Sequence, residues 1–289
     1  TPDIAIVLNV EADHLNIYGS EREVAAAFRE FMERAPASGT VITNADSPLL
    51  AETVGAAAIK ARRETCSVTG AATWTAGPSR QSDRGQSFDV AHDGAPFGTF
   101  SITMPGRHNV GNALTAIAAC TAIGMQPDVI RETMASFIGA HRRFEYVGEA
   151  GGVTVVDDYA HHPTEVAMLV RSARERFEGR RVVMVFQPHT FSRTKYMLNE
   201  FKTCFEGVDK LYIAVTDGSR ERAEEGATSE ELISVVTSPT PVYLPAVDDA
   251  AADLVASDLR AGDVLFTVGA GYIDRAGPMV LERLRSRAA

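Results

Sequence analysis

The densest group of residues that could do chemistry is the segment 157–165, which reads DDYAHHPTE. It follows the apolar run Val153–Val156, and Pro163 indicates that a helix begins inside it. In an open α/β sheet, ligands bind beyond the carboxyl ends of the strands, so polar groups gathered there are placed to act on a ligand. A helix cap would need only one side-chain oxygen. We therefore interpret the segment as functional. The alternative is that these polar side chains only cap the start of a helix.

Metal binding is the first chemistry that this segment suggests. Four of its side chains are metal-ligand types, namely Asp158, His161, His162 and Glu165. A dinuclear hydrolase uses such side chains to activate water. A metal-dependent hydrolase is therefore one hypothesis for the chain.

The elements that would position this segment alternate between strands and helices from residue 141 onward, as in a Rossmann-like, doubly wound sheet. Three strand ends carry polar or glycine-rich tips and should line one edge of that sheet: Asp157-Asp158-Tyr159, Gln187-Pro188-His189 and Gly269-Ala270-Gly271. The expected strands are Val153–Val156, Val182–Phe186, Lys210–Val215, Val242–Leu244 and Val264–Val268. The expected helices are Pro163–Phe177, Thr194–Phe205, Ser229–Val236, Asp248–Leu259 and Met279–Arg287.

Residues 1–140 have a different texture. The continuous apolar run Ile4–Val10 predicts a strand buried on both faces, and the spacing in Glu21–Arg34 predicts a helix. Short alternating segments between residues 65 and 104, broken by Gly and Pro, predict antiparallel strands. An Ala-rich helix that ends at Ile123 and a second one, Pro127–Phe137, complete this part. The sequence thus predicts an α/β fold with two domains, 1–140 and a Rossmann-like C-terminal domain at 141–289.

Length, charge and hydropathy exclude several classes of protein. At 289 residues the chain is long enough for two domains. Its formal net charge of -10 argues against a nucleic-acid partner, because binding to a phosphate backbone needs clustered Lys and Arg. No apolar run approaches the roughly 20 residues that span a bilayer, so we expect no membrane partner and a cytoplasmic location. Cys66, Cys120 and Cys204 form no Cys-x-x-Cys pair and are expected to be reduced, buried thiols.

Two glycine-containing turns bear on nucleotide binding. The turn at 269–271 lacks the third glycine of the dinucleotide fingerprint, since residue 274 is Asp, and this argues against a nicotinamide dehydrogenase. The segment PGRHNVGN at 105–112 opens a helix with an imidazole and two amides, which can hold a purine or a phosphate. A well-capped structural helix is the alternative there.

Six segments, taken in their order and spacing, resemble the Mur ligase family over essentially the whole chain. They read NVEADHLNIYG, PGRHNVGNALTAIAA, HRRFE, DDYAHHPTE, FQPHTFSRT and VGAGYI. The segment FQPHTFSRT is most similar to the members that add L-alanine to UDP-N-acetylmuramate, and less similar to those that recycle murein tripeptide. Six ordered motifs are far more specific than any one of them.

The resemblance implies that residues 1–140 are the remainder of a central nucleotide-binding (ATP-binding) domain without its phosphate loop, and that residues 141–289 are the C-terminal ligase domain. It also implies a mechanism and a role for particular residues. ATP phosphorylates the muramoyl carboxylate to an acyl phosphate, the amine of L-alanine attacks it, and cations stabilise the developing charge. By resemblance, His14 binds Mg²⁺ and Arg143 contacts the ATP phosphates. The implied nucleotide-binding residues are His108, Asn109, Asn112, Arg143 and Asp158. The implied substrate-binding residues are Tyr159, His161, His189, Ser192 and Arg193, and the implied catalytic set is His14, Arg143, Asp158 and His161.

One part of the family pattern does not occur in these 289 residues. Mur ligases have an N-terminal domain that binds the UDP sugar, followed by a phosphate loop, and no Gly-x-x-x-x-Gly-Lys-[Ser/Thr] is present here. The chain begins at Thr1 and an apolar run follows almost at once. We therefore expect an excised piece of a ligase that does not catalyse ligation by itself. A non-catalytic module that binds nucleotide or muramoyl peptide is the alternative.

Overall fold

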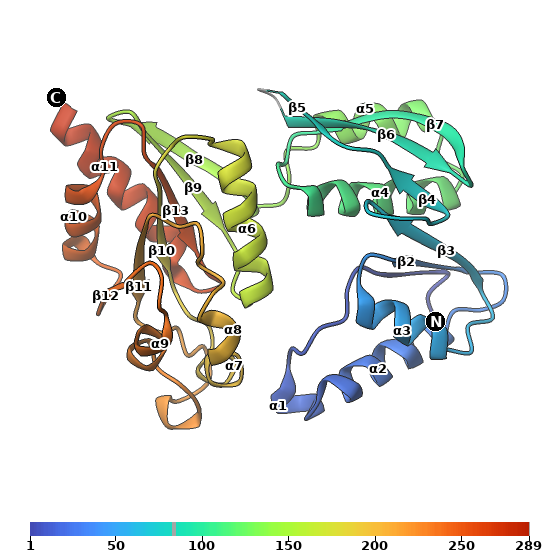
Figure 1. Ribbon diagram of the computed structural model, residues 1–289, viewed down its shortest axis with the longest axis horizontal. Coiled ribbons are helices and arrows are strands. Elements are labelled where there is room, and N and C mark those ends of the chain that lie inside the picture. Colours follow the sequence, from blue (N-terminus) through green and yellow to red (C-terminus); the bar gives the residue numbers. More distant parts are fainter. Residues whose placement is uncertain (83–84, 289) are drawn as a thin grey trace. The chain divides into compact units, whose positions relative to one another are not determined.

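The computed structural model describes residues 1–82 and 85–288, and the chain divides into two compact units, Thr1–Ile138 and Gly139–Ala289 (Figure 1). Each unit is built on one sheet that combines parallel and antiparallel strands, which confirms the predicted α/β fold class. Within the described residues, no helix has both the length and the apolar composition needed to cross a membrane.

The sheet of the first unit joins a parallel half to an antiparallel half. The parallel strands are, in order, β1 (Ile4–Val7), β2 (Thr40–Asn44), β3 (Arg62–Ser67) and β4 (Trp74–Ala76). The antiparallel part consists of β6 (Gly85–His92), which pairs with β4, with β5 (Arg80–Ser82) and with β7 (Ala95–Ile102). The antiparallel strands predicted between residues 65 and 104 are therefore present, although β3 is parallel.

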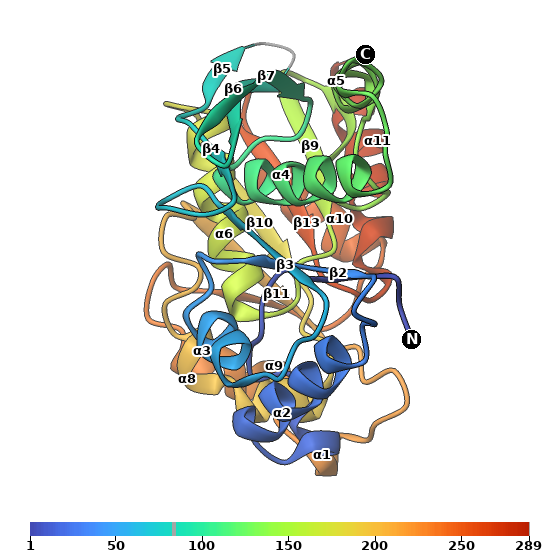
Figure 2. The ribbon, with the colours of Figure 1, turned by 90° about the vertical axis from the view of Figure 1, so that its right-hand side faces the viewer.

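Helices cover this sheet through two hydrophobic clusters. After the short α1 (Leu15–Tyr18), α2 (Glu21–Glu33) and α3 (Pro48–Ala56) pack with β1 and β2. The second cluster brings α4 (Arg107–Ala122) and α5 (Pro127–Ser136) against β4, β6 and β7. Figure 2 shows α4 on one side of β2 and β3, with α2 and α3 on the other. The start of α4 thereby lies close to the carboxyl ends of the parallel strands, since Arg107 donates to the Val68 carbonyl at 2.5 Å.

The expectation that Ile4–Val10 is buried on both faces is wrong. The strand is the shorter β1, in which Ala5 and Val7 are buried while Ile6 is 41% exposed. β1 lies at the edge of the sheet, and its buried side chains face the cluster with α2 and α3. On the other face Ile4 packs against the second cluster, whereas Ile6 stays accessible.

The second unit is a doubly wound sheet with the strand order β12-β11-β10-β13-β9-β8. Its parallel strands are β12 (Val242–Leu244), β11 (Lys210–Ala214), β10 (Val182–Phe186), β13 (Val264–Val268) and β9 (Val153–Asp158). Every strand predicted for this unit is present, within about two residues of its expected ends. The antiparallel edge strand β8 (Glu145–Ala150) is missing from the prediction, because its sequence EYVGEA contains no apolar run.

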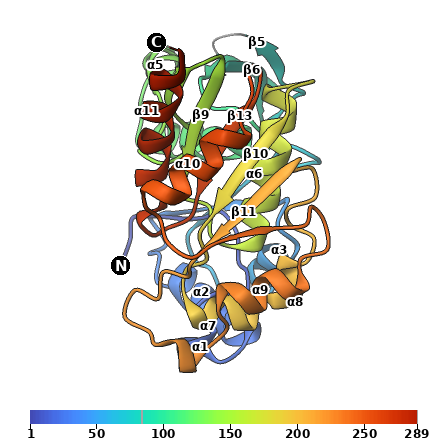
Figure 3. The ribbon, with the colours of Figure 1, turned by 90° about the vertical axis from the view of Figure 1, so that its left-hand side faces the viewer.

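Helices cover both faces of this second sheet. On one face, α6 (Pro163–Arg176), α8 (Leu198–Phe201) and α9 (Ser229–Val235) pack around Phe186 and Phe266. On the other, α10 (Asp249–Asp258) and α11 (Ala276–Ala288) pack around Val185 and Leu265, and Figure 3 shows these two helices in front of the strands. Because alternate residues of the central strands β9, β10, β11 and β13 enter opposite clusters, these strands read as continuous apolar runs.

One predicted helix of this unit is divided. In place of Thr194–Phe205 the structure has α7 (Phe191–Tyr196), which begins three residues earlier, and then α8 after Met197. The early start has a distant cause, because Glu221 Oε2 accepts the Ser192 N–H at 2.8 Å from 29 residues away. No local sequence pattern reveals such a partner.

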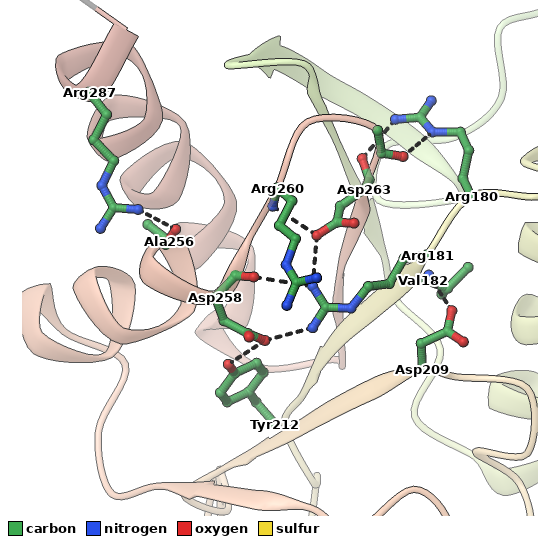
Figure 4. Close-up of polar contacts among 11 residues, drawn as sticks. Arg180, Arg181, Val182, Asp209, Tyr212, Ala256, Asp258, Arg260, Asp263 and Arg287 are labelled. Carbon is green, nitrogen blue, oxygen red and sulfur yellow. Dashed lines mark hydrogen bonds and ion pairs between the residues drawn. The ribbon is translucent and has the colours of Figure 1, made fainter.

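An arginine–carboxylate network fastens β10 to its neighbours at the amino ends of the strands (Figure 4). Arg181, just before β10, donates to Asp263 Oδ2 and to Asp258 Oδ2, each at 2.9 Å. Arg180 donates to the carbonyls of Gly262 and Asp263, both at 2.7 Å. This network lies at the opposite end of the strands from the polar tips, so it stabilises the sheet without entering the candidate site.

Candidate functional site

The three polar strand ends of the second unit lie side by side, as the strand order requires. The Gly269 N–H donates to the Asp158 carbonyl at 3.0 Å, and the Gln187 N–H donates to the Val268 carbonyl at 2.9 Å. The chain leaves β10 and β13, which are neighbours, toward opposite faces of the sheet. Such a switch point is where open α/β sheets bind their ligands.

Arg142 fastens this edge of the sheet together. Its guanidinium donates to Asp157 Oδ2 at 2.8 Å, to the Gly271 carbonyl at 2.9 Å and to the Gly269 carbonyl at 2.7 Å. It also lies over the Tyr159 ring at 5.1 Å, and its side chain is only 11% exposed. The N–H donors of Arg142 are therefore used to hold β9 and β13 to the start of this unit, and they are not available to bind a ligand.

The backbone around Arg142 is strained, and the neighbouring strand end holds it in place. Arg142 and Phe144 have φ values of 58° and 49°, in the left-handed region that is costly for residues other than glycine. Asp158 Oδ2 accepts the Phe144 N–H at 2.8 Å, and the Arg142 carbonyl accepts the Tyr159 N–H at 2.7 Å. The backbone of Arg143 is thus held between two residues, Arg142 and Phe144, whose backbones are hydrogen-bonded to the end of β9.

Asp158 is a buried carboxylate that supports the backbone on two sides. Its Oδ1 accepts the Ala160 N–H and its Oδ2 accepts the Phe144 N–H, each at 2.8 Å. Burial raises the pKa of Asp158 to about 6, and the two N–H donors and the nearby Arg143 offset only part of this effect. Because both oxygens contact the backbone, these bonds give Asp158 a positioning role, and its contact with a nucleotide stays a prediction.

The raised pKa of Asp158 predicts a pH dependence of stability. The folded protein holds this proton more tightly than the unfolded chain, whose Asp pKa is about 3.9, so Asp158 favours folding most at low pH. Its contribution to the free energy of unfolding should fall by about 2–3 kcal/mol as the pH rises from about 4 to 6, and then stay level. Urea unfolding of the protein and of Asp158→Asn at several pH values measures the difference between them. A difference that does not change with pH would refute the prediction.

Arg143, Tyr159, His161 and Glu165 form a more accessible part of the site. The Arg143 guanidinium lies over the Tyr159 ring at 5.5 Å and 3.9 Å from Glu165 Oε1, and its side chain is 47% exposed. Glu165 Oε2 accepts the His161 N–H at 3.0 Å, and the His161 and Tyr159 rings meet edge to face at 5.5 Å. An accessible guanidinium supported by an aromatic ring suits a phosphate or a carboxylate.

A second group of predicted residues lies at the end of β10 and in α7. The His189 ring is 6.3 Å from the His161 ring, which links the two groups. Burial lowers the pKa of His189, which keeps its imidazole neutral near pH 7. Arg193 donates to the His189 carbonyl, and the Ser192 hydroxyl donates to Glu221 at 2.5 Å. The structure thus brings together seven of the predicted residues: Arg143, Asp158, Tyr159, His161, His189, Ser192 and Arg193.

The other predicted residues lie in the first unit. His14 is the left-handed residue that precedes α1, and its Nε2 is 3.7 Å from Asp13 Oδ2. His108, Asn109 and Asn112 lie in the first turns of α4. Asn109 donates to a backbone carbonyl at 2.7 Å, and Asn112 donates to Asn109 Oδ1 at 3.3 Å. These bonds order the two amides, and the exposed Asn112 presents its side chain to solvent.

The structure gives little support to a metal site. Across the described ranges, 1–82 and 85–288, no three His, Cys, Asp or Glu side chains are grouped to hold a metal ion. His162 Nδ1 instead caps α6 by accepting the Thr164 N–H at 3.2 Å, and the Asp158 oxygens accept backbone N–H groups. The cluster expected for a metal-dependent hydrolase is therefore not formed. Asp13 and His14 do not by themselves match the octahedral oxygen shell of Mg²⁺, so we assign no chemical step to that ion.

Local sequence patterns do not directly reveal the residues that hold the site in place. The resemblance assigns a role to Arg143 and none to Arg142, although the Arg142 side chain is buried in hydrogen bonds and the Arg143 side chain is accessible. A signal existed, because two consecutive carboxylates after a buried strand need a cationic or hydrogen-bonding partner. Asp217, which follows β11, could also have been found from its place at a strand end. Glu221 had no such signal.

Comparison with family models identifies both units. The model of the Mur ligase middle domain matches residues 1–120, and the model of the Mur ligase glutamate ligase domain matches residues 142–271. The chain belongs to the Mur ligase family. The two matched ranges leave out residues 121–141 and 272–289.

Individual relatives of this Mur ligase chain carry a common name. The UDP-N-acetylmuramate--L-alanine ligase of Anaeromyxobacter sp. is 38% identical over 99% of this chain and 62% of that protein. The ligase of the same name from Kineococcus radiotolerans is 40% identical over 99% of this chain and 61% of that protein. The crystal structure of UDP-N-acetylmuramate-alanine ligase from Thermotoga maritima superposes with a TM-score of 0.76 at 25% identity, over 99% of this chain and 60% of that one. The chain thus spans about three fifths of the length of these relatives.

Proposed function

We propose that this Mur ligase chain forms the middle and C-terminal parts of a cytoplasmic enzyme of peptidoglycan synthesis, which uses ATP to join L-alanine to UDP-N-acetylmuramate. The observation that carries the proposal is the carboxyl edge of the second unit, where Arg143 ahead of β8, His189 after β10 and Arg193 on α7 gather. Relatives named for this reaction align over 99% of the chain, which supports the same substrates here.

The proposed reaction needs a site that binds anions and also presents an amine. ATP would supply the phosphoryl group that turns an unreactive carboxylate into an acyl phosphate. Arg143, which lies over the Tyr159 ring, would bind a phosphoryl oxygen as negative charge develops. Arg193, held by the His189 carbonyl, offers a second guanidinium for a substrate carboxylate. Both side chains start from anchored backbone, so their donors need little reorganisation during the reaction.

In the first unit we assign three residues at the start of α4 to the nucleotide. Asn109 and Asn112 offer amide groups to a purine edge, and His108 lies beside them. His14 remains our candidate for a residue that lies near the ATP phosphates. Mg²⁺ would accompany ATP, and we assign no reaction step to it. The UDP sugar would be held by an N-terminal domain that these 289 residues do not include.

An oxygen-label experiment tests the proposed route. The natural protein that contains this chain is given ATP, Mg²⁺, L-alanine and UDP-N-acetylmuramate with an ¹⁸O-labelled muramoyl carboxylate. An acyl phosphate carries one labelled oxygen into the released phosphate, so the proposal expects labelled phosphate. Phosphate without label, released together with ligated product, would rule out that route.

The isolated 289 residues serve as a control in the same assay. Since they contain no phosphate-loop motif, we expect them to release no phosphate in response to L-alanine. L-alanine-dependent release by the isolated chain would show that expectation to be wrong. If the natural protein also binds its substrates without turnover, the non-catalytic binding module becomes the better account.

A further inference from the structure

Gln187, directly after β10, has a buried oxygen that no described residue satisfies. The side chain is 0% exposed, and its Nε2 donates to the Val215 carbonyl at 3.1 Å. Its Oε1 is buried and accepts no hydrogen bond from any residue in the described part of the chain. Leaving such an acceptor unpaired is unfavourable, so a buried oxygen without a partner points to a missing donor.

A carboxylate oxygen of Asp217 approaches the same place. Asp217 follows β11 and is tied to the end of β10, because its N–H donates to the Pro188 carbonyl at 2.9 Å. A Cβ added to Gly271 would overlap Asp217 Oδ2 and would lie 2.7 Å from Gln187 Oε1. Both oxygens therefore converge beside the Gly271 backbone, at the carboxyl edge already described. Any side chain at position 271 would block this place.

The chemistry of the two oxygens selects the kind of ligand. A carboxylate and an amide oxygen are both acceptors, so they repel a phosphate or carboxylate and favour a cation with several N–H donors. A primary ammonium group has three such donors and no acceptor. His189 Nδ1, a buried ring nitrogen with no partner among the described residues, lies at the same strand end.

We propose that Asp217 and Gln187 bind the ammonium group of the amino-acid substrate. The inference rests on the proposed function and goes further, because it assigns the amine to two residues outside the predicted site. Arg193 lies one helical turn after His189 and donates a hydrogen bond to the His189 carbonyl. The backbone of His189 in turn forms a β-bridge with the backbone of Asp217. A negative group for the amine and a positive group for the carboxylate thus occur on adjoining segments, as a zwitterionic amino acid requires.

The side-chain amide signal of Gln187 tests this assignment in the 289-residue chain. The protein is titrated with L-alanine, with methylammonium and with propionate, while NMR follows that signal. L-alanine and methylammonium should shift it, whereas propionate, which lacks the ammonium, should not. Asp217→Asn should weaken the response to L-alanine at least about tenfold, because it removes the charge of the acceptor.

Two features of the design keep the result interpretable. The amide that Asp217→Asn introduces retains an oxygen for the Ser219 N–H, which Asp217 Oδ1 accepts at 2.9 Å, so the variant is expected to fold. Asp253→Asn removes an equal charge from the exposed surface of α10, where Arg283 keeps its bond to Asp249, and should leave the response unchanged. An unchanged response in Asp217→Asn would overturn the assignment. No response to any of the three probes would overturn it as well, and would leave a bound water as the donor to Gln187.

The natural protein separates this inference from the proposed function. If it ligates L-alanine and Asp217→Asn raises KM for L-alanine at least about tenfold with KM for ATP unchanged, both stand. If it ligates L-alanine and Asp217→Asn leaves that KM unchanged, the amine is bound elsewhere and only the inference fails. If the unmodified protein ligates no amino acid, the proposed function fails, and the inference that rests on it fails too.

Discussion

Replacing Arg142 by alanine is expected to lower the free energy of unfolding by about 3–5 kcal/mol, because it leaves the buried Asp157 carboxylate without its cation. Asp157 keeps the bond from Thr267 Oγ1 at 2.5 Å, but burial already raises its pKa. The same change removes the donors to the Gly269 and Gly271 carbonyls. Urea unfolding of the 289-residue chain, followed by circular dichroism, measures the loss.

Arg143→Ala is the matched control for this change. It removes a guanidinium from the next residue, whose side chain is 47% exposed and lies 3.9 Å from Glu165, so stability should change by less than about 1 kcal/mol. Arg142→Lys keeps the charge and loses the planar fork, and should fall between the two. Equal losses for Arg142→Ala and Arg143→Ala would contradict the division of roles between these neighbours.

Arg143→Ala should instead lower kcat for ligation in the natural protein by about 10³-fold. A guanidinium that stabilises a transferring phosphoryl group is worth about 10³–10⁵ in rate, and Arg143 is the accessible arginine of the pair. Steady-state phosphate release at saturating substrates measures the effect.

Arg171 provides the control for the loss of activity. It is an exposed arginine on α6, and Arg171→Ala should leave kcat unchanged. Arg143→Lys should recover part of the rate, because it restores the charge without the two-pronged donor geometry. If Arg143→Ala keeps more than about a tenth of the activity, the group that stabilises the phosphoryl transfer is a different one.

The central parallel strands of the second unit, β9, β10, β11 and β13, could be predicted because their side chains are buried on both faces. Val182–Phe186 and Val264–Val268 have the bounds expected from their apolar runs. The edge strands show the limit of this signal. β8 pairs on one side and has no apolar run, whereas β1 has such a run yet leaves Ile6 accessible. Burial depends on neighbours that a local pattern does not contain.

The candidate site was predictable to the extent that it follows strand ends. The tips of β9, β10 and β13 gather at one edge because parallel strands end together, and His161 and His189 lie near each other for that reason. The supporting contacts depend on distant residues. The bond between Ser192 and Glu221 spans 29 residues, and the bond from Arg142 to the Gly271 carbonyl spans 129. Contacts between residues so far apart in the sequence cannot be predicted from local spacing.

The most direct test of the proposed function is product analysis of the natural protein that contains this chain. The protein is incubated with ATP, Mg²⁺, UDP-N-acetylmuramate and L-alanine, and the products are identified by mass spectrometry. We expect UDP-N-acetylmuramoyl-L-alanine in amounts equal to the ADP and phosphate formed. ATP hydrolysis without this product, or a product formed only with a different amino acid or acceptor, would contradict it.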